Sequence, residues 1–314
     1  MRARTNPLQA AAERADGCGV YPGDDERTRR AFQPSSQQPG STAVPAPVRR
    51  TVSGRATAVA VCAVLLSVGA GWRMLPWQHD PPPAGASALA LGDLPPLPAD
   101  ARATRIHPEV VTLLTGEHAF LRTRPDGTPV APDPCRPFHY AINPAGMPQG
   151  TELLVREAIA FVSEYTGLAF VEDPFTDETV DELREPVQAG RYGDRWAPLL
   201  VAMADEAVME SLGGSTAAVA QPHTVATSGP DSERVVTGQI ALDSAFTVQA
   251  VRAPAGQATM RLVLMHELGH IVGLDHVADP TQIMHDTSTG YHYLGNGDRQ
   301  GLAAVGAGRC FSDG

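Results

Sequence analysis

Hydrophobic and polar positions from residue 134 onward switch between the spacing of helices and that of strands. Apolar side chains recur at helical spacing over residues 149–166, and Gly167 ends this predicted helix. A second helix is predicted over 258–272, and a short one over 296–305. Apolar runs between the helices predict strands at 138–143, 168–171, 199–204, 215–220 and 235–242. The pattern predicts a mixed fold of helices and strands, interrupted by a polar loop at 174–196.

The segment that precedes this fold has weaker patterns. Two short strands are predicted at 110–114 and 119–123, on either side of a turn at Gly116. We therefore expect residues 106–131 to form a short β segment. Residues 76–105 are rich in Pro, Ala and Gly, which is typical of a semi-extended stalk.

One apolar run, residues 56–75, is long enough to cross a membrane. Three arginines precede this run and only Arg73 lies near its end, so the positive-inside rule predicts a cytoplasmic N-terminus and an outward-facing C-terminal part. Residues 1–55 are rich in Pro, Gly, Ser and Gln and are expected to be a disordered cytoplasmic tail. Two alternatives for the run are a cleaved signal peptide, which would give a secreted protein, and a buried core helix.

The charge of the chain narrows the choice of partners. Its net charge is −11, and residues 132–314 hold ten Arg against 24 acidic residues, a net −14. Binding to nucleic acid requires clustered cations, so this acidic part argues against nucleic acid as a partner. A single candidate span also excludes a multi-spanning channel or transporter.

The candidate chemistry lies in the predicted helix 258–272 and in the turn after it. His266 and His270 are four residues apart, so on a helix they share a face and can bind one metal ion. Gly273 lets the chain turn back and present His276 as a third ligand. Three protein ligands leave one position for water, which is typical of a catalytic zinc site. Glu267 is the neighbour that can reach this water. His-Glu-x-x-His alone also arises by chance, but the longer pattern fixes five positions and favours the metal site.

Residues 266–276 resemble the H-E-x-x-H-x-x-G-x-x-H signature of the metzincin metallopeptidases. Met284 follows at the place where that family has its Met-turn, a methionine beneath the zinc ligands. The Gly-Leu-Asp-His run and the short distance to Met284 are most similar to small bacterial matrixin-like peptidases. The chain departs from that pattern at Val277, where matrixins usually have Ser, and at residues 285–286, where they have Tyr-Pro.

The resemblance implies an α+β, zincin-like fold for residues 132–314, with a twisted mixed sheet, an active-site helix, a second long helix and a short C-terminal helix. It also implies one catalytic zinc ion, with Glu267 as the general base in peptide-bond hydrolysis. In metzincins an extended peptide substrate pairs with an edge strand of the sheet. The candidate for this strand is 215–220, which follows Gly213 and Gly214, with Gly214, Ser215 and Ala217 as tentative contacts. An ordinary sheet strand with a glycine turn is the alternative.

The four cysteines divide by expected compartment. Cys18 lies in the tail and Cys62 in the apolar run, where neither is expected to form a disulfide. Cys135 and Cys310 bracket the outward-facing domain, and we expect a bridge between them. The alternative is that Cys135 blocks the zinc ion, like the latency thiol of matrixins.

Taken together, the sequence predicts a membrane-anchored, outward-facing zinc endopeptidase that acts on a peptide or protein. Two other functions stay open: a zinc-binding module without catalysis, and a zinc hydrolase of cell-wall peptides. The remaining histidines, among them His139 and His223, are expected to be ordinary solvated side chains.

Overall fold

The computed structural model describes residues 94–254, 256–286 and 293–312, all of which belong to one compact unit. The tail, the apolar run 56–75 and the first part of the predicted stalk lie outside these residues. Within the described part of the chain, no helix has both the length and the apolar character needed to cross a membrane.

A five-stranded sheet runs in the order β3-β2-β4-β6-β5. The chain forms its strands at Phe138–Ile142 (β2), Phe170–Glu172 (β3), Leu199–Ala204 (β4), Ala218–Val225 (β5) and Arg234–Asp243 (β6). Strands β3, β2, β4 and β6 are parallel to one another, whereas β5 pairs antiparallel with β6 and forms one edge. The twisted mixed sheet that the sequence predicts is confirmed.

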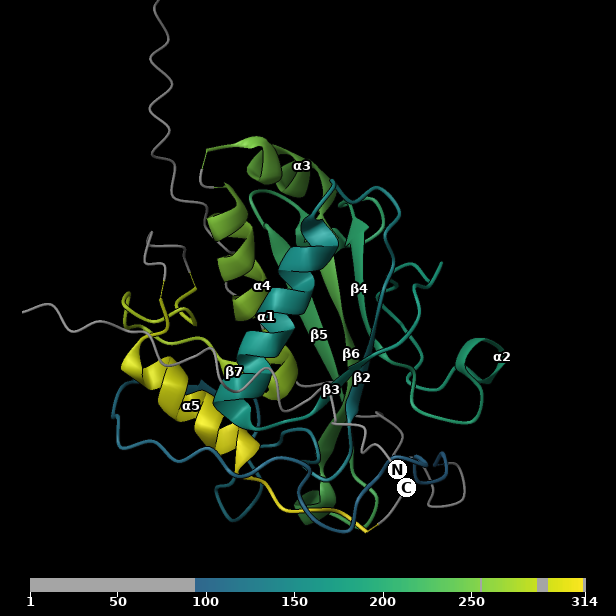
Figure 1. The fold of residues 1–314 in the computed structure, drawn as a ribbon, viewed down its shortest axis with the longest axis vertical. Helices are drawn as coiled ribbons and strands as arrows, with labels where there is room; N and C mark the ends of the chain where they lie inside the picture. The colour runs from purple at the N-terminus through teal and green to yellow at the C-terminus, as the bar shows by residue number, and fades with distance from the viewer. Residues whose placement is uncertain (1–93, 255, 287–292, 313–314) are drawn as a thin grey trace, which may run out of the picture. The chain divides into compact units, whose positions relative to one another are not determined.

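Two of the helices, α1 and α4, lie side by side against one face of this sheet (Figure 1). The helices are Thr151–Thr166 (α1), Ala189–Tyr192 (α2), Ser244–Arg252 (α3), Gly256–Val272 (α4) and Asn296–Gly306 (α5). Residues one helical turn apart, such as Leu154 and Ala158 of α1 and Leu264 and Leu268 of α4, are buried in the main core. Burial of these apolar stripes is the main source of the fold's stability.

The opposite face of the sheet has a smaller core of its own. Side chains alternate between the two faces of a strand, so Leu199 of β4 joins the main core while Leu200 points the other way. Val180, from the stretch predicted to be a polar loop, packs in this second cluster. The buried Glu178 and Arg184 side chains form an ion pair of 2.8 Å beside it. Apart from the short helix α2, the acidic stretch is therefore irregular, as predicted, and it covers the sheet.

The edge strand β5 begins later than the sequence predicts. Gly214 adopts a left-handed conformation (φ +78°) in a turn with Ser215, and both residues precede the strand. The Ala217 carbonyl accepts a hydrogen bond from the Asp243 amide, and the continuous pairing with β6 starts at Ala218. Gly214 and Ser215 thus lie in the turn before the edge strand, whereas Ala217 already bonds with β6, and the role of these residues as substrate contacts stays a prediction.

The N-terminal part of the described chain lies along the domain instead of extending away from it. Ala119–Phe120 (β1) pairs antiparallel with Leu274–Asp275 (β7) in a separate two-stranded sheet. The strand predicted at 110–114 is absent, and Leu113 there is 96% exposed. Residues 94–105, predicted to be stalk, also contact the domain: the Asp100 carboxylate lies 2.9 Å from the His139 ring.

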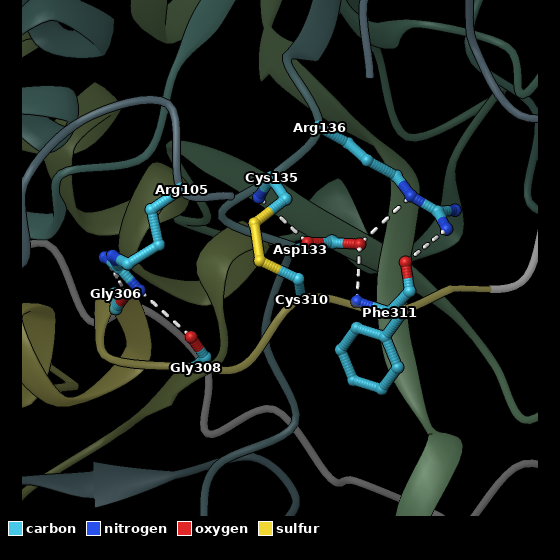
Figure 2. The surroundings of a disulfide bond; sticks show 8 residues. All are labelled: Arg105, Asp133, Cys135, Arg136, Gly306, Gly308, Cys310 and Phe311. Carbon is cyan, nitrogen blue, oxygen red and sulfur yellow. Dashed lines mark hydrogen bonds and ion pairs between the residues drawn. A yellow bond between two sulfur atoms is a disulfide. The ribbon is translucent and has the colours of Figure 1, made fainter. Parts of the chain in front are cut away.

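A disulfide joins Cys135 to Cys310, with their Cα atoms 5.4 Å apart (Figure 2). The Asp133 carboxylate accepts hydrogen bonds from the Cys135 and Phe311 amides on either side of the bridge. The Arg105 guanidinium donates to the carbonyls of Gly306, the last residue of α5, and Gly308, at 2.7 and 2.9 Å. The bridge and these contacts fasten both ends of the domain to each other.

Candidate metal centre

Helix α4 and the turn after it bring three imidazoles together. The Nε2 atoms of His266 and His270 are 3.0 Å apart, and the Nε2 atom of His276 lies 3.1 Å from each of them. The three ring nitrogens therefore form a nearly equilateral triangle. Three ligands at tetrahedral zinc, each about 2.0–2.1 Å from the metal, are separated by about 3.3 Å. The ligand atoms fit such an ion closely.

The outer nitrogen of two ligands has a fixed partner. The Nδ1 atom of His266 lies 2.7 Å from the Ile283 carbonyl oxygen, and that of His270 lies 2.9 Å from the Leu274 carbonyl oxygen. A carbonyl only accepts, so each Nδ1 carries the proton and each Nε2 presents its lone pair to the centre of the triangle. Burial, together with the neighbouring His276, lowers the pKa of His266 to about 4. This ligand stays neutral near pH 7, as metal binding requires.

The third ligand depends on a glycine turn. Gly273 ends α4 with φ +114°, and a Cβ there would lie 2.5 Å from the Val130 carbonyl oxygen. Only glycine fits this position without strain. The Leu121 amide donates to the Gly273 carbonyl, which holds β1 against the chain leading to His276.

Met284 is almost fully buried, and its sulfur lies against Gly269, the residue before the second histidine. Its carbonyl accepts a hydrogen bond of 3.0 Å from the Val277 amide, just after the third ligand. The Asp298 carboxylate, in the first turn of α5, accepts hydrogen bonds from the Ile283 and Met284 amides at 2.7 and 3.2 Å. Asp298 thus holds the segment whose Ile283 carbonyl orients His266.

Glu267 is buried beside the metal site. Burial raises its pKa to about 8, and a hydrogen bond from the Ala220 amide of β5 offsets part of this effect. Its contact with Ala220 also places the edge strand next to the metal site.

These elements fall in the part of the chain that matches a known family. Residues 210–305 match the matrixin peptidase family. This segment is matrixin-like. It contains β5, α4, all three histidines, Met284 and nearly all of α5. Matrixins are zinc metallopeptidases, so the match supports a zinc metallopeptidase activity for this chain. No curated protein matches the chain.

Compared with the sequence predictions, the matrixin-like centre brings together His266, Glu267, His270, His276 and Met284 as the motif requires. Cys135 is bonded to Cys310 in the structure, so it is not a free thiol that could block zinc.

Two residues escaped the sequence reasoning. Asp298 lies in the first turn of a helix that also contains Asn296, Arg299 and Gln300, so its sequence surroundings do not mark it as buried. His139, expected to be an ordinary solvated side chain, lies between two carboxylates: its Nδ1 is 2.8 Å from Asp173 and its Nε2 is 2.9 Å from Asp100.

Proposed function

We propose that this chain is a zinc-dependent endopeptidase in which Glu267 is the general base. The observation that carries the proposal is the convergence of three imidazole lone pairs, 3.0–3.1 Å apart, with Glu267 on the same helix. His266, His270 and His276 would hold the metal. When bound, zinc would acidify a water molecule and polarise the substrate carbonyl.

Glu267 would carry the proton through the reaction. Its carboxylate takes a proton from the attacking water and then donates it to the amine nitrogen as the peptide bond breaks. The Ala220 amide orients the carboxylate from one side, because it donates a hydrogen bond to it. A purely structural zinc site has no use for this buried acid, which argues against a binding module without catalysis.

The substrate would be an extended peptide held along β5. This strand is an edge of the sheet, and Ala220 within it contacts the proposed base. An edge strand offers main-chain donors and acceptors to any extended chain, which suits an enzyme that acts on peptides of varied sequence.

We also propose that the domain is anchored in the cell membrane by residues 56–75 and faces outward. The arginines before this run support the orientation. The disulfide between Cys135 and Cys310 supports an oxidising compartment. Secretion after cleavage of the apolar run is the alternative, and the size of the mature protein in membrane and medium fractions distinguishes the two.

The experiment uses the full-length chain, purified in detergent, with unfolded casein as substrate. We expect cleavage that stops when phenanthroline removes the metal and returns when zinc is added back. The Glu267→Ala variant should be inactive, and Glu157→Ala, which removes an exposed glutamate of α1, serves as its matched control. Zinc binding without cleavage of casein would overturn the proposal in favour of a binding module, and cleavage of cell-wall peptides alone would favour the narrower hydrolase.

A further inference from the structure

One long side of β5 has no described strand beside it; Ala218 and Ala220 are buried there, and Pro222 is half-buried. Among the described strands, β5 pairs only with β6, which lies on its other side. An extended peptide adding to this side would use the main-chain groups that point away from β6. Which residues of β5 carry those groups follows from a single contact.

The Ala220 amide shows which residues of β5 have main-chain groups that point away from β6. Because this amide donates to Glu267, it points away from β6. Ala220 and Ile240 are therefore a non-hydrogen-bonded pair of the antiparallel ladder. The direction of the main-chain N–H and C=O groups alternates from one residue of a strand to the next, so those of residues 218 and 222 point the same way as those of Ala220. The register is continuous from Ala218 to His223, and the irregularity comes only after His223. The main-chain groups of residue 222 therefore point away from β6, as those of Ala220 do.

Position 222 is a proline. Proline has no amide hydrogen, and within sheets it is accepted only where that donor would face away from the neighbouring strand. Of the three positions that point this way, Ala218 has an N–H group, the Ala220 N–H is bonded to Glu267, and Pro222 has only a carbonyl. The irregularity between His223 and Thr224 then breaks the regular pairing pattern.

Resting on the proposed peptidase function, we propose that Pro222 limits main-chain recognition of the substrate on the N-terminal side of the scissile bond. Glu267 beside Ala220 marks where the bond is cut. Antiparallel pairing is the more stable arrangement, and a peptide bound in this way faces Pro222 with residues that precede that bond. The substrate carbonyl opposite Pro222 has no donor. Substrate residues after the scissile bond face Ala218, whose N–H group is a donor for their carbonyls.

Kinetics on two peptides test this assignment. Both come from a casein fragment that the enzyme cuts; the long one extends past Pro222 on the N-terminal side and the short one stops before it. For the unaltered enzyme we expect kcat/KM values within about twofold of each other. In Pro222→Ala the new donor should raise kcat/KM for the long peptide roughly 3- to 10-fold, the range expected for one hydrogen bond, and leave the short one unchanged. Ala218→Pro is the matched variant: it removes a donor on the other side and should slow both peptides.

The outcomes separate this inference from the proposed function. If casein is not cut at all, the peptidase proposal fails and this inference fails with it. If casein is cut but Pro222→Ala has the same kcat/KM as the unaltered enzyme for both peptides, only the inference is overturned. Pro222 would then serve to prevent edge-to-edge aggregation. If the variant does not fold, a large preference of the unaltered enzyme for the long peptide still contradicts the inference, and equal rates support it.

Discussion

The sulfur of Met284 lies where a side chain at position 269 would have to be: a Cβ on Gly269 would be 2.5 Å from the Met284 Sδ atom and 3.2 Å from its Cε atom. Gly269 directly precedes the second histidine of the metal motif, so the helix approaches the methionine closely at the level of the ligands. The absence of a side chain at position 269 is what permits Met284 to pack this closely against α4.

This relationship predicts a coupling between the two residues. Gly269→Ala should lower the free energy of unfolding by about 1–3 kcal/mol, because it overpacks the contact with Met284. In a Met284→Ala background, the same substitution should instead stabilise by up to about 1 kcal/mol, because alanine is the better residue inside a helix. Urea unfolding of the four proteins measures this cycle. Equal effects of Gly269→Ala in both backgrounds would show that the two side chains do not compete for space.

Asp298 should set the affinity for zinc without touching the metal. Asp298→Asn replaces one of the two acceptor oxygens that hold the Ile283 and Met284 amides, and so loosens the carbonyl that orients His266. We expect zinc affinity to fall about 10- to 100-fold, the usual effect of losing an outer partner of a metal ligand. Competition with a chelator measures it. Asp194→Asn, at an exposed position, is the control, and an equal loss in both variants would contradict this role.

The His139 network predicts a stability that depends on pH. Both ring nitrogens face carboxylates, and the hydrogen bond to Asp173, more than that to Asp100, raises the pKa of His139 above its usual 6.5 despite burial. The folded state therefore binds this proton more tightly than the unfolded state, and the stabilisation is complete below about pH 6.5 and lost as pH rises through the folded pKa. His139→Gln should lower the free energy of unfolding more at pH 6 than at pH 8. A loss of unfolding free energy that is larger at pH 8 than at pH 6 would contradict this prediction.

The disulfide should contribute much of the domain's stability. It closes a loop of 175 residues, and the Cys135→Ser/Cys310→Ser variant should lose about 2–5 kcal/mol of unfolding free energy. Cys18→Ser/Cys62→Ser, which alters the two cysteines expected to be reduced, should lose nothing. Mass mapping without reductant checks the pairing directly, and finding both thiols free would exclude the bridge.

Local signals accounted for the features that the sequence predicted well. The spacing of His266 and His270 requires only a helix, and Gly273 requires only a turn, so both follow from neighbouring residues. Helix α3 was missed although its start is also local: Asp243 caps it by accepting a hydrogen bond from the Phe246 amide at 2.6 Å.

Features that depend on distant partners were not predictable in this way. The start of β5 is set by its pairing with β6, not by its own apolar run. The roles of Asp298 and His139 depend on groups that lie 14–15 and 34–39 residues away along the chain. A sequence with no structure gives no indication that these groups meet.

The most direct test of the central claim is to compare zinc content and casein cleavage in one preparation of the Glu267→Gln variant. The substitution keeps the size of the side chain and removes its ability to take up a proton. We predict about one zinc ion per chain, as in the unaltered protein, with a rate of cleavage reduced at least about 100-fold, the lower range for a lost general base. Cleavage at an undiminished rate with zinc bound would contradict the account, because the reaction would then proceed without its proposed base.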